Sequence, residues 1–117
     1  MDLGVWMSPA VLEHKLETGE EAKHEQAWNL SRWPRGGFPP GEQHRLFVAS
    51  RGSWCGYFLL SGEALFNPDD ERAPYTLLFD ARSWTEIGPV PVRRFRGFTY
   101  DVPTLPAQPP AKGPPVT

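Results

Sequence analysis

Two apolar runs near the middle of the chain dominate its hydrophobic pattern. Leu46–Ala49 and Trp54–Leu60 flank a short polar segment, Ser50–Ser53, which contains Gly52. Short apolar runs bounded by Gly and Ser are typical of strands, and Gly readily takes the positive φ of a tight hairpin turn. Both runs are apolar at successive positions rather than alternating, which indicates strands that are covered on both faces. We therefore predict a central antiparallel hairpin.

The segment before this hairpin predicts an amphipathic helix. Ser8 is a good N-cap, and Pro9 suits the first helical position because its missing N–H costs nothing there. Leu12 and Leu16 lie one turn apart on one face, and Gly19 supplies a left-handed stop. The residues predicted to face solvent are Glu13, Lys15 and Glu17.

The remaining runs predict further short elements. Strands are expected at Leu3–Trp6, Tyr75–Phe79 and Val90–Tyr100, and Gly62–Phe66 either extends the hairpin or begins another strand. Asp80–Trp84 predicts a helical turn, and Glu20–Leu30 predicts a turn followed by a short strand or a helical turn. Pro and Gly forbid regular structure in Arg32–Gly41 and Asn67–Pro74, which are expected to be loops.

Several short strands with one early helix predict an α+β fold, a small and partly open antiparallel β-barrel. The N-terminal amphipathic helix is expected to cover one open side of this barrel. Six of the 14 prolines lie between Pro103 and Pro115. We therefore predict a domain over residues 1–102 and an extended, Pro-rich tail over residues 103–117.

Charge and cysteine content restrict the class of protein. The formal net charge of −2 argues against a general polyanion binder, but acids gather in Glu13–Glu25 and arginines gather elsewhere. Cys55 is the single cysteine, so no internal disulfide is expected, and no apolar run reaches the ~20 residues of a membrane span. We expect a cytoplasmic protein without a cofactor. The spacing of His14, His24 and His44 predicts no metal site.

Interleaved arginine and aromatic residues give the clearest functional signal. Single-stranded nucleic acid is held by cations along its phosphates and by flat side chains against its bases. The candidate binding residues are Arg32, Trp33, Arg35, Arg51, Trp54, Arg94 and Arg96. Each also has a structural alternative, because Trp54 suits a core position and exposed arginines are commonly solvated. The functional interpretation requires the arginines to converge on one cleft beside Trp33.

The first half of the chain resembles the ASCH branch of the PUA-like superfamily. The residues that carry this resemblance are Leu16-Glu17-Thr18-Gly19, then Lys23 and Trp28, and then Pro40-Gly41-Glu42 leading into Arg45–Ser50. The resemblance implies a pseudo-barrel that holds RNA, or an unpaired or modified base, in a cleft beside the helix. Some members hydrolyse modified nucleosides, and the resemblance implies Lys23 and Glu25 as the residues of this chain for two of the catalytic positions.

Two alternatives to nucleic-acid binding stay open. In the first, the protein is an interaction or regulatory module whose Pro-rich tail is a polyproline ligand and whose acidic helix is a docking face. In the second, it is a nucleoside amidohydrolase. A catalytic Lys needs a lowered pKa, whereas the glutamates around Lys23 favour its charged form. We therefore expect binding rather than catalysis.

Overall fold

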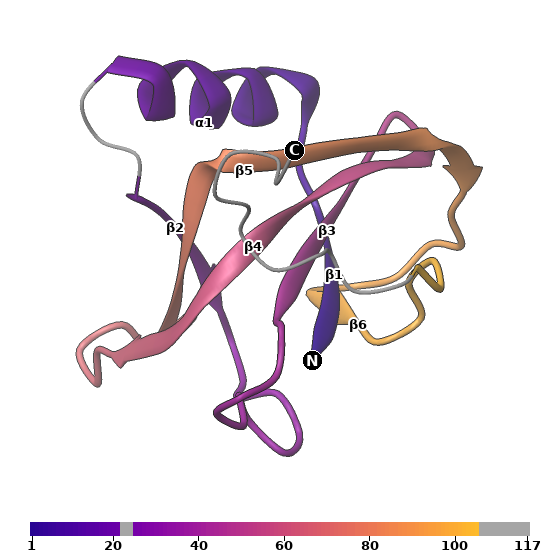
Figure 1. The fold of residues 1–117 in the computed structure, drawn as a ribbon. Helices are drawn as coiled ribbons and strands as arrows, with labels where there is room; N and C mark the ends of the chain where they lie inside the picture. Colours follow the sequence, from indigo (N-terminus) through magenta and orange to yellow (C-terminus); the bar gives the residue numbers. More distant parts are fainter. Residues whose placement is uncertain (22–24, 106–117) are drawn as a thin grey trace, which may run out of the picture.

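The computed structural model describes residues 1–21 and 25–105, which form a curved mixed sheet with one helix (Figure 1). The elements are β1 (Asp2–Trp6), α1 (Pro9–Glu21), β2 (Glu25–Leu30), β3 (Arg45–Ser50), β4 (Ser53–Phe66), β5 (Tyr75–Pro91) and β6 (Phe98–Thr99). The strand order is β2-β5-β4-β3-β1-β6. The sheet curls into a nearly closed barrel, which confirms the small β-barrel with one helix.

The central hairpin is formed by β3 and β4, as predicted. A two-residue turn joins them, with φ of 54° at Arg51 and 80° at Gly52. Positive φ at both central residues is the requirement of a type I′ turn, whose twist matches that of the flanking strands. β4 continues without a break to Phe66, so Gly62–Phe66 extends the second strand of the hairpin.

Hydrophobic side chains are buried on both faces of β3. Leu46 and Val48 point into the main core, inside the barrel, while Phe47 and Ala49 belong to a second cluster on its outer side. The main core contains Leu3, Val5, Met7, Leu30, Leu46, Val48, Phe58, Leu77, Phe79, Ala81 and Phe98. The outer cluster contains Phe47, Ala49, Trp54 and Tyr57. Burial on two sides explains why β3 is apolar at successive positions.

The prediction of a purely antiparallel sheet was wrong at one place. β1 pairs with β3 in parallel, with Asp2 opposite Arg45 and Trp6 opposite Ala49. A parallel pair needs a long crossover connection, and here α1, β2 and the following loop supply it. β6 then pairs antiparallel with β1 and forms the edge of the sheet.

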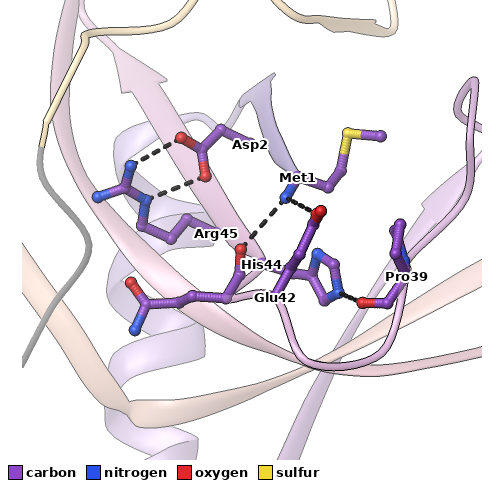
Figure 2. Close-up of polar contacts among 7 residues, drawn as sticks. Met1, Asp2, Pro39, Glu42, His44 and Arg45 are labelled. Carbon is purple, nitrogen blue, oxygen red and sulfur yellow. Dashed lines mark hydrogen bonds and ion pairs between the residues drawn. The ribbon is translucent and has the colours of Figure 1, made fainter. Parts of the chain in front are cut away.

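A buried ion pair fixes the register of β1 against β3 (Figure 2). Arg45 is only 5% exposed, and its guanidinium donates to both carboxylate oxygens of Asp2, from Nε at 3.0 Å and from Nη2 at 2.7 Å. Nη2 also donates to the backbone oxygen of Leu105 at 2.8 Å. The hydrogen bond to Asp2 raises the pKa of Arg45. One cation therefore ties together β1, β3 and the C-terminal segment.

Helix α1 begins as predicted but continues further. The Ser8 hydroxyl accepts a hydrogen bond from the backbone N of Val11, and the helix runs two residues past Gly19. Leu12 and Leu16 pack against the main core. Lys15 was wrongly placed on the solvent side. It is partly buried and its Nζ donates to the oxygen of Ala27 in β2 at 2.9 Å, and burial lowers its pKa. Within the described residues, no helix has the length and apolar character to cross a membrane.

Strand β5 replaces a predicted strand and helical turn. Asp80–Trp84 lies within this strand, where the pairing moves from Tyr57↔Thr85 to Leu59↔Asp80. Between these two pairs, one residue of β4 lies opposite four residues of β5, which is a large β-bulge. Asp80 Oδ1 accepts from the backbone N of Arg82 at 2.9 Å. Asp80 therefore forms its turn-like hydrogen bond locally, but pairing with β4 on both sides of the bulge keeps β5 in the sheet.

The predicted last strand, Val90–Tyr100, was also wrong. β5 ends at Pro91, residues 92–97 form a connection that contains Gly97 at a φ of 67°, and β6 holds only Phe98 and Thr99. Glu25–Leu30, which the sequence left between strand and helical turn, is strand β2. Beyond β6, Val102 and Leu105 pack against the outer cluster. Residues 106–117, most of the predicted tail, lie outside the described residues.

Replacing Asp2 with Asn should destabilise the protein strongly. The change removes the carboxylate charge opposite the buried Arg45 cation, which should reduce the free energy of unfolding by about 3 kcal/mol. Urea unfolding followed by circular dichroism measures this loss. The control is Arg82→Gln, which breaks the exposed pair between Arg82 and Asp80 and should cost less than about 1 kcal/mol. Equal losses in the two variants would contradict the assigned role of Arg45.

Replacing Gly56 with Ala should also destabilise the fold. A Cβ on Gly56 would collide with the backbone oxygen of Thr85 and lie 2.7 Å from the Trp84 ring, so β4 and β5 would have to separate. We expect a loss of about 3 kcal/mol in the free energy of unfolding. Gly88→Ala is the matched control, because a Cβ on Gly88 meets nothing within 4 Å. That variant should keep the wild-type stability.

Candidate nucleic-acid interface

The loop after β2 is held in place by its own turn and by a buried proline. Pro34 is fully buried, and its oxygen accepts a hydrogen bond from the backbone N of Gly37 at 3.1 Å. Gly36, with a φ of 75°, occupies the third position of this turn, where a type II turn requires a positive φ. Arg35 is therefore presented at the tip of an ordered turn.

This loop follows β2, at one end of the sheet, and its side chains contact β6, at the other end. The Arg32 guanidinium lies 4.8 Å from the ring centroid of Phe98 in β6, and the Arg35 guanidinium lies 4.8 Å from that of Tyr100. The Tyr100 hydroxyl also accepts a hydrogen bond from the backbone N of Arg35 at 2.7 Å. Cation–π contacts of this kind are favourable at partly exposed sites. They place the loop from β2 beside β6, although these two strands are not paired.

A hollow of about 400 Å³ opens where the loop meets β6. We call it the loop–β6 hollow, and it is lined by Arg32, Trp33, Arg35, Phe98, Thr99 and Tyr100. Trp33 is 43% exposed and is held by ring contacts with Phe38 and Tyr75, each at 5.4 Å between centroids. The hollow therefore combines two cations with a fixed indole.

The loop–β6 hollow is electropositive. No carboxylate lines it, and within residues 1–21 and 25–105 neither Arg32 nor Arg35 forms an ion pair. Burial alone would raise the pKa of Tyr100, but hydrogen bonds to Arg35 and the charges of Arg35 and Arg32 outweigh it. The pKa of Tyr100 consequently lies below its ordinary value of 10.0. An anion at this position would meet the same two charges.

The other predicted binding residues lie elsewhere. Arg51 is exposed in the β3–β4 turn, beside α1. Trp54 is only 3% exposed and stacks on Phe95 within the outer cluster, so the structural alternative holds for this residue. Arg94 and Arg96 are exposed in the connection between β5 and β6 rather than in the strand predicted over Val90–Tyr100. Of the arginines expected beside Trp33, the structure brings only Arg32 and Arg35 there.

Sequence reasoning missed Phe98, Thr99 and Tyr100 as lining residues. They lie more than 60 positions after Trp33, and their place depends on the pairing of Phe98 with Val5 and of Thr99 with Gly4. No local pattern in the sequence predicts this pairing, because β6 has only two residues. The aromatic residues at 98 and 100 were the one available signal.

The candidate catalytic residues receive no support. Lys23 lies outside the described residues, and Glu25 is exposed at the start of β2. The described residues bring together no group of three or more His, Cys, Asp or Glu side chains that would suit a metal ion. His44 donates through Nε2 to the oxygen of Pro39, 2.9 Å away, and packs edge-on against Phe38.

A groove does lie beside the helix, where the resemblance implied a cleft. Its volume is about 340 Å³, and it runs between α1 and the β3–β4 turn. The lining residues are Pro9, Leu12, Glu13, Leu16, Glu17, Ser50, Arg51 and Cys55. Among the described residues, no exposed large hydrophobic side chain lines this groove. Arg51 is its single cation among the described residues, so it matches the expected base-binding chemistry less well than the loop–β6 hollow does.

Comparisons with known proteins give one structural similarity. No family model matches the sequence, and no curated protein matches it. Among solved structures, the chain is similar to the crystal structure of the YTH domain of the Zygosaccharomyces rouxii MRB1 protein in complex with N6-methyladenosine RNA. The TM-score is 0.37 at 14% identity, over 77% of this chain and 61% of that chain. This TM-score is too low to establish a shared fold, and the chain spans less than two thirds of that domain's length.

Replacing Arg35 with Gln should raise the pKa of Tyr100. The variant loses a positive charge and a side-chain hydrogen bond, while the burial that opposes ionisation remains. The tyrosinate absorbance, recorded as a function of pH, measures the change. The same titration of Tyr100→Phe identifies which part of the signal belongs to this residue. An unchanged titration curve in Arg35→Gln would show that the guanidinium does not act on the phenol.

Proposed function

We propose that this protein is a binding module for single-stranded RNA or DNA, which places one unpaired base in the loop–β6 hollow. The observation that carries the proposal is the convergence of Arg32 and Arg35 with an exposed, fixed Trp33 around a hollow that no carboxylate lines. The volume of about 400 Å³ lies within the range of ligand pockets, roughly 300–1,000 Å³. A planar base and its phosphate need this combination of a ring and cations.

Trp33 is suited to stack on a base because it is already ordered. Phe38 contacts it edge-on with an interplanar angle of 86°, and Tyr75 contacts it at 52°. Neither partner stacks face to face on the indole. The stacking of a base on Trp33 therefore costs little side-chain conformational entropy, and every base offers the required π-face.

The two arginines are suited to phosphate because their planar groups are already oriented. Each guanidinium lies against an aromatic ring on one side, and each residue is exposed. Arginine binds phosphate with two parallel hydrogen bonds when its fork is held in place. The arginine–aromatic contacts that close the barrel thus also hold the guanidinium groups in an orientation that suits anion binding.

The PUA-like type of the barrel belongs to this proposal. It is supported by the order of β1, α1 and the strands that follow, and by the position of the single described helix across one end of the barrel (Figure 1). Neither alternative function has comparable support. The tail beyond Leu105 and Lys23 lie outside the described residues, and Glu25 has no described catalytic partner.

Trp33→Ala should weaken the binding of a fluorescein-labelled oligouridylate at low salt. Loss of one stacked base is worth about 1–3 kcal/mol, or roughly a 5- to 150-fold rise in Kd. Fluorescence anisotropy measures Kd, and Trp33→Phe should recover most of the affinity because it keeps an aromatic plane.

The matched control for this variant is Leu65→Ala. Leu65 is a large hydrophobic residue, 56% exposed on β4, that does not line the loop–β6 hollow. Its replacement should leave Kd unchanged. The proposal fails if folded wild-type protein shows no binding to oligouridylate or oligothymidylate at low salt, or if Trp33→Ala binds as the wild type does.

A further inference from the structure

Two more hollows adjoin the loop–β6 hollow through shared lining residues. Thr99 lines the loop–β6 hollow and also a second one, of about 370 Å³, which we call the central hollow. Arg94 and Phe95 line the central hollow and also a third one, of about 530 Å³, which we call the Trp6 hollow. Shared lining residues therefore join the three hollows in one row.

The connection between β5 and β6 makes this row cationic. Arg93 and Arg94 line the central hollow, and Arg94 and Arg96 line the Trp6 hollow. All three are exposed, and none forms an ion pair within the described part of the chain. Asp101 is the one carboxylate among the residues that line the three hollows. Together with Arg32 and Arg35, five arginines follow the row.

A stack of three rings ends at the Trp6 hollow. Trp54, buried in the outer cluster, stacks on Phe95 at 5.7 Å with an interplanar angle of 16°. Phe95 in turn stacks on Trp6 at 5.3 Å and 24°. The buried end of the stack holds Phe95 and Trp6 in position, and Trp6 is partly exposed where it lines the hollow. The row thus has an ordered aromatic platform at each end, Trp33 and Trp6.

We infer that these three hollows form one binding track for an extended single strand of nucleic acid. One base stacks at Trp33, a second base stacks at Trp6, and the phosphates between them contact Arg93, Arg94 and Arg96. This inference rests on the proposed function, since it continues the strand that the loop–β6 hollow binds. An isolated nucleoside or a single base would use only one end of the track.

The alternating chemistry favours a nucleic acid over an acidic peptide. Flat rings at both ends offer stacking surfaces, and nucleic acid places a planar base on every phosphate-bearing unit. An acidic peptide would satisfy the arginines but would place no planar group against the exposed parts of Trp33 and Trp6. Competition with oligoglutamate separates these two ligands.

The test measures Kd for labelled oligouridylates of increasing length, from two nucleotides upward, against wild type and the double variant Arg94→Gln/Arg96→Gln. Wild-type affinity should rise with length until the track is filled and then level off. The double variant should keep the wild-type affinity for the dinucleotide and lose the gain for longer strands. Its slope of log K against log salt should fall by about 1.4, or about 0.7 for each lost phosphate contact.

The matched control is Arg72→Gln/Arg82→Gln, which removes two exposed arginines that line none of the three hollows. This variant should show the wild-type length dependence. If affinity does not depend on length and the double variant binds normally, while Trp33→Ala still abolishes binding, the track is wrong and the proposed function stands. If Trp33→Ala has no effect at any length, the proposed function itself fails. Competition by oligoglutamate as strong as that by oligouridylate would overturn the track as a nucleic-acid site.

Discussion

The pair between Arg45 and Asp2 is the interaction on which the rest of the structure depends. A cation that is 5% exposed needs a charged partner, and both carboxylate oxygens of Asp2 provide it. Asp2 stands opposite Arg45 in the parallel β1–β3 register, so a slip of one residue would leave Arg45 buried without this partner. The same guanidinium also binds the oxygen of Leu105, which holds the C-terminal segment over the outer cluster.

The candidate interface follows from this register. Since β1 is fixed on β3, its other edge is free to pair with Phe98 and Thr99, and β6 becomes the end of the sheet. A two-residue strand is a weak element by itself. Phe98 is anchored in the main core, and the contacts of Arg32 with Phe98 and of Arg35 with Tyr100 bring the loop from β2 against it. The barrel is closed at this point by side chains rather than by backbone pairing.

Structural and functional interpretations of the same arginines are therefore compatible. Arg32 and Arg35 each use one side of a planar group to close the barrel, and no described carboxylate neutralises either charge. A closure made from ionised side chains leaves a positive potential at the surface, which the lowered pKa of Tyr100 reflects.

The sequence by itself determined the local elements whose signals are local. Ser8 and Pro9 begin α1, Gly52 permits the tight turn, and the unbroken apolar runs of the hairpin indicate burial on both faces. Tertiary structure decided what depends on distant partners. Asp80–Trp84 carries a turn signal, yet the pairs Leu59↔Asp80 and Tyr57↔Thr85 with β4 keep it within β5 as a bulge. Trp33 and Arg35 were recognised from their loop. Tyr100 comes close to them only through the β1–β6 pairing, and a two-residue strand leaves too short a pattern in the sequence to be predicted. Whether two residues 65 positions apart form one site depends on strand register, and register depends on the packing of the whole sheet.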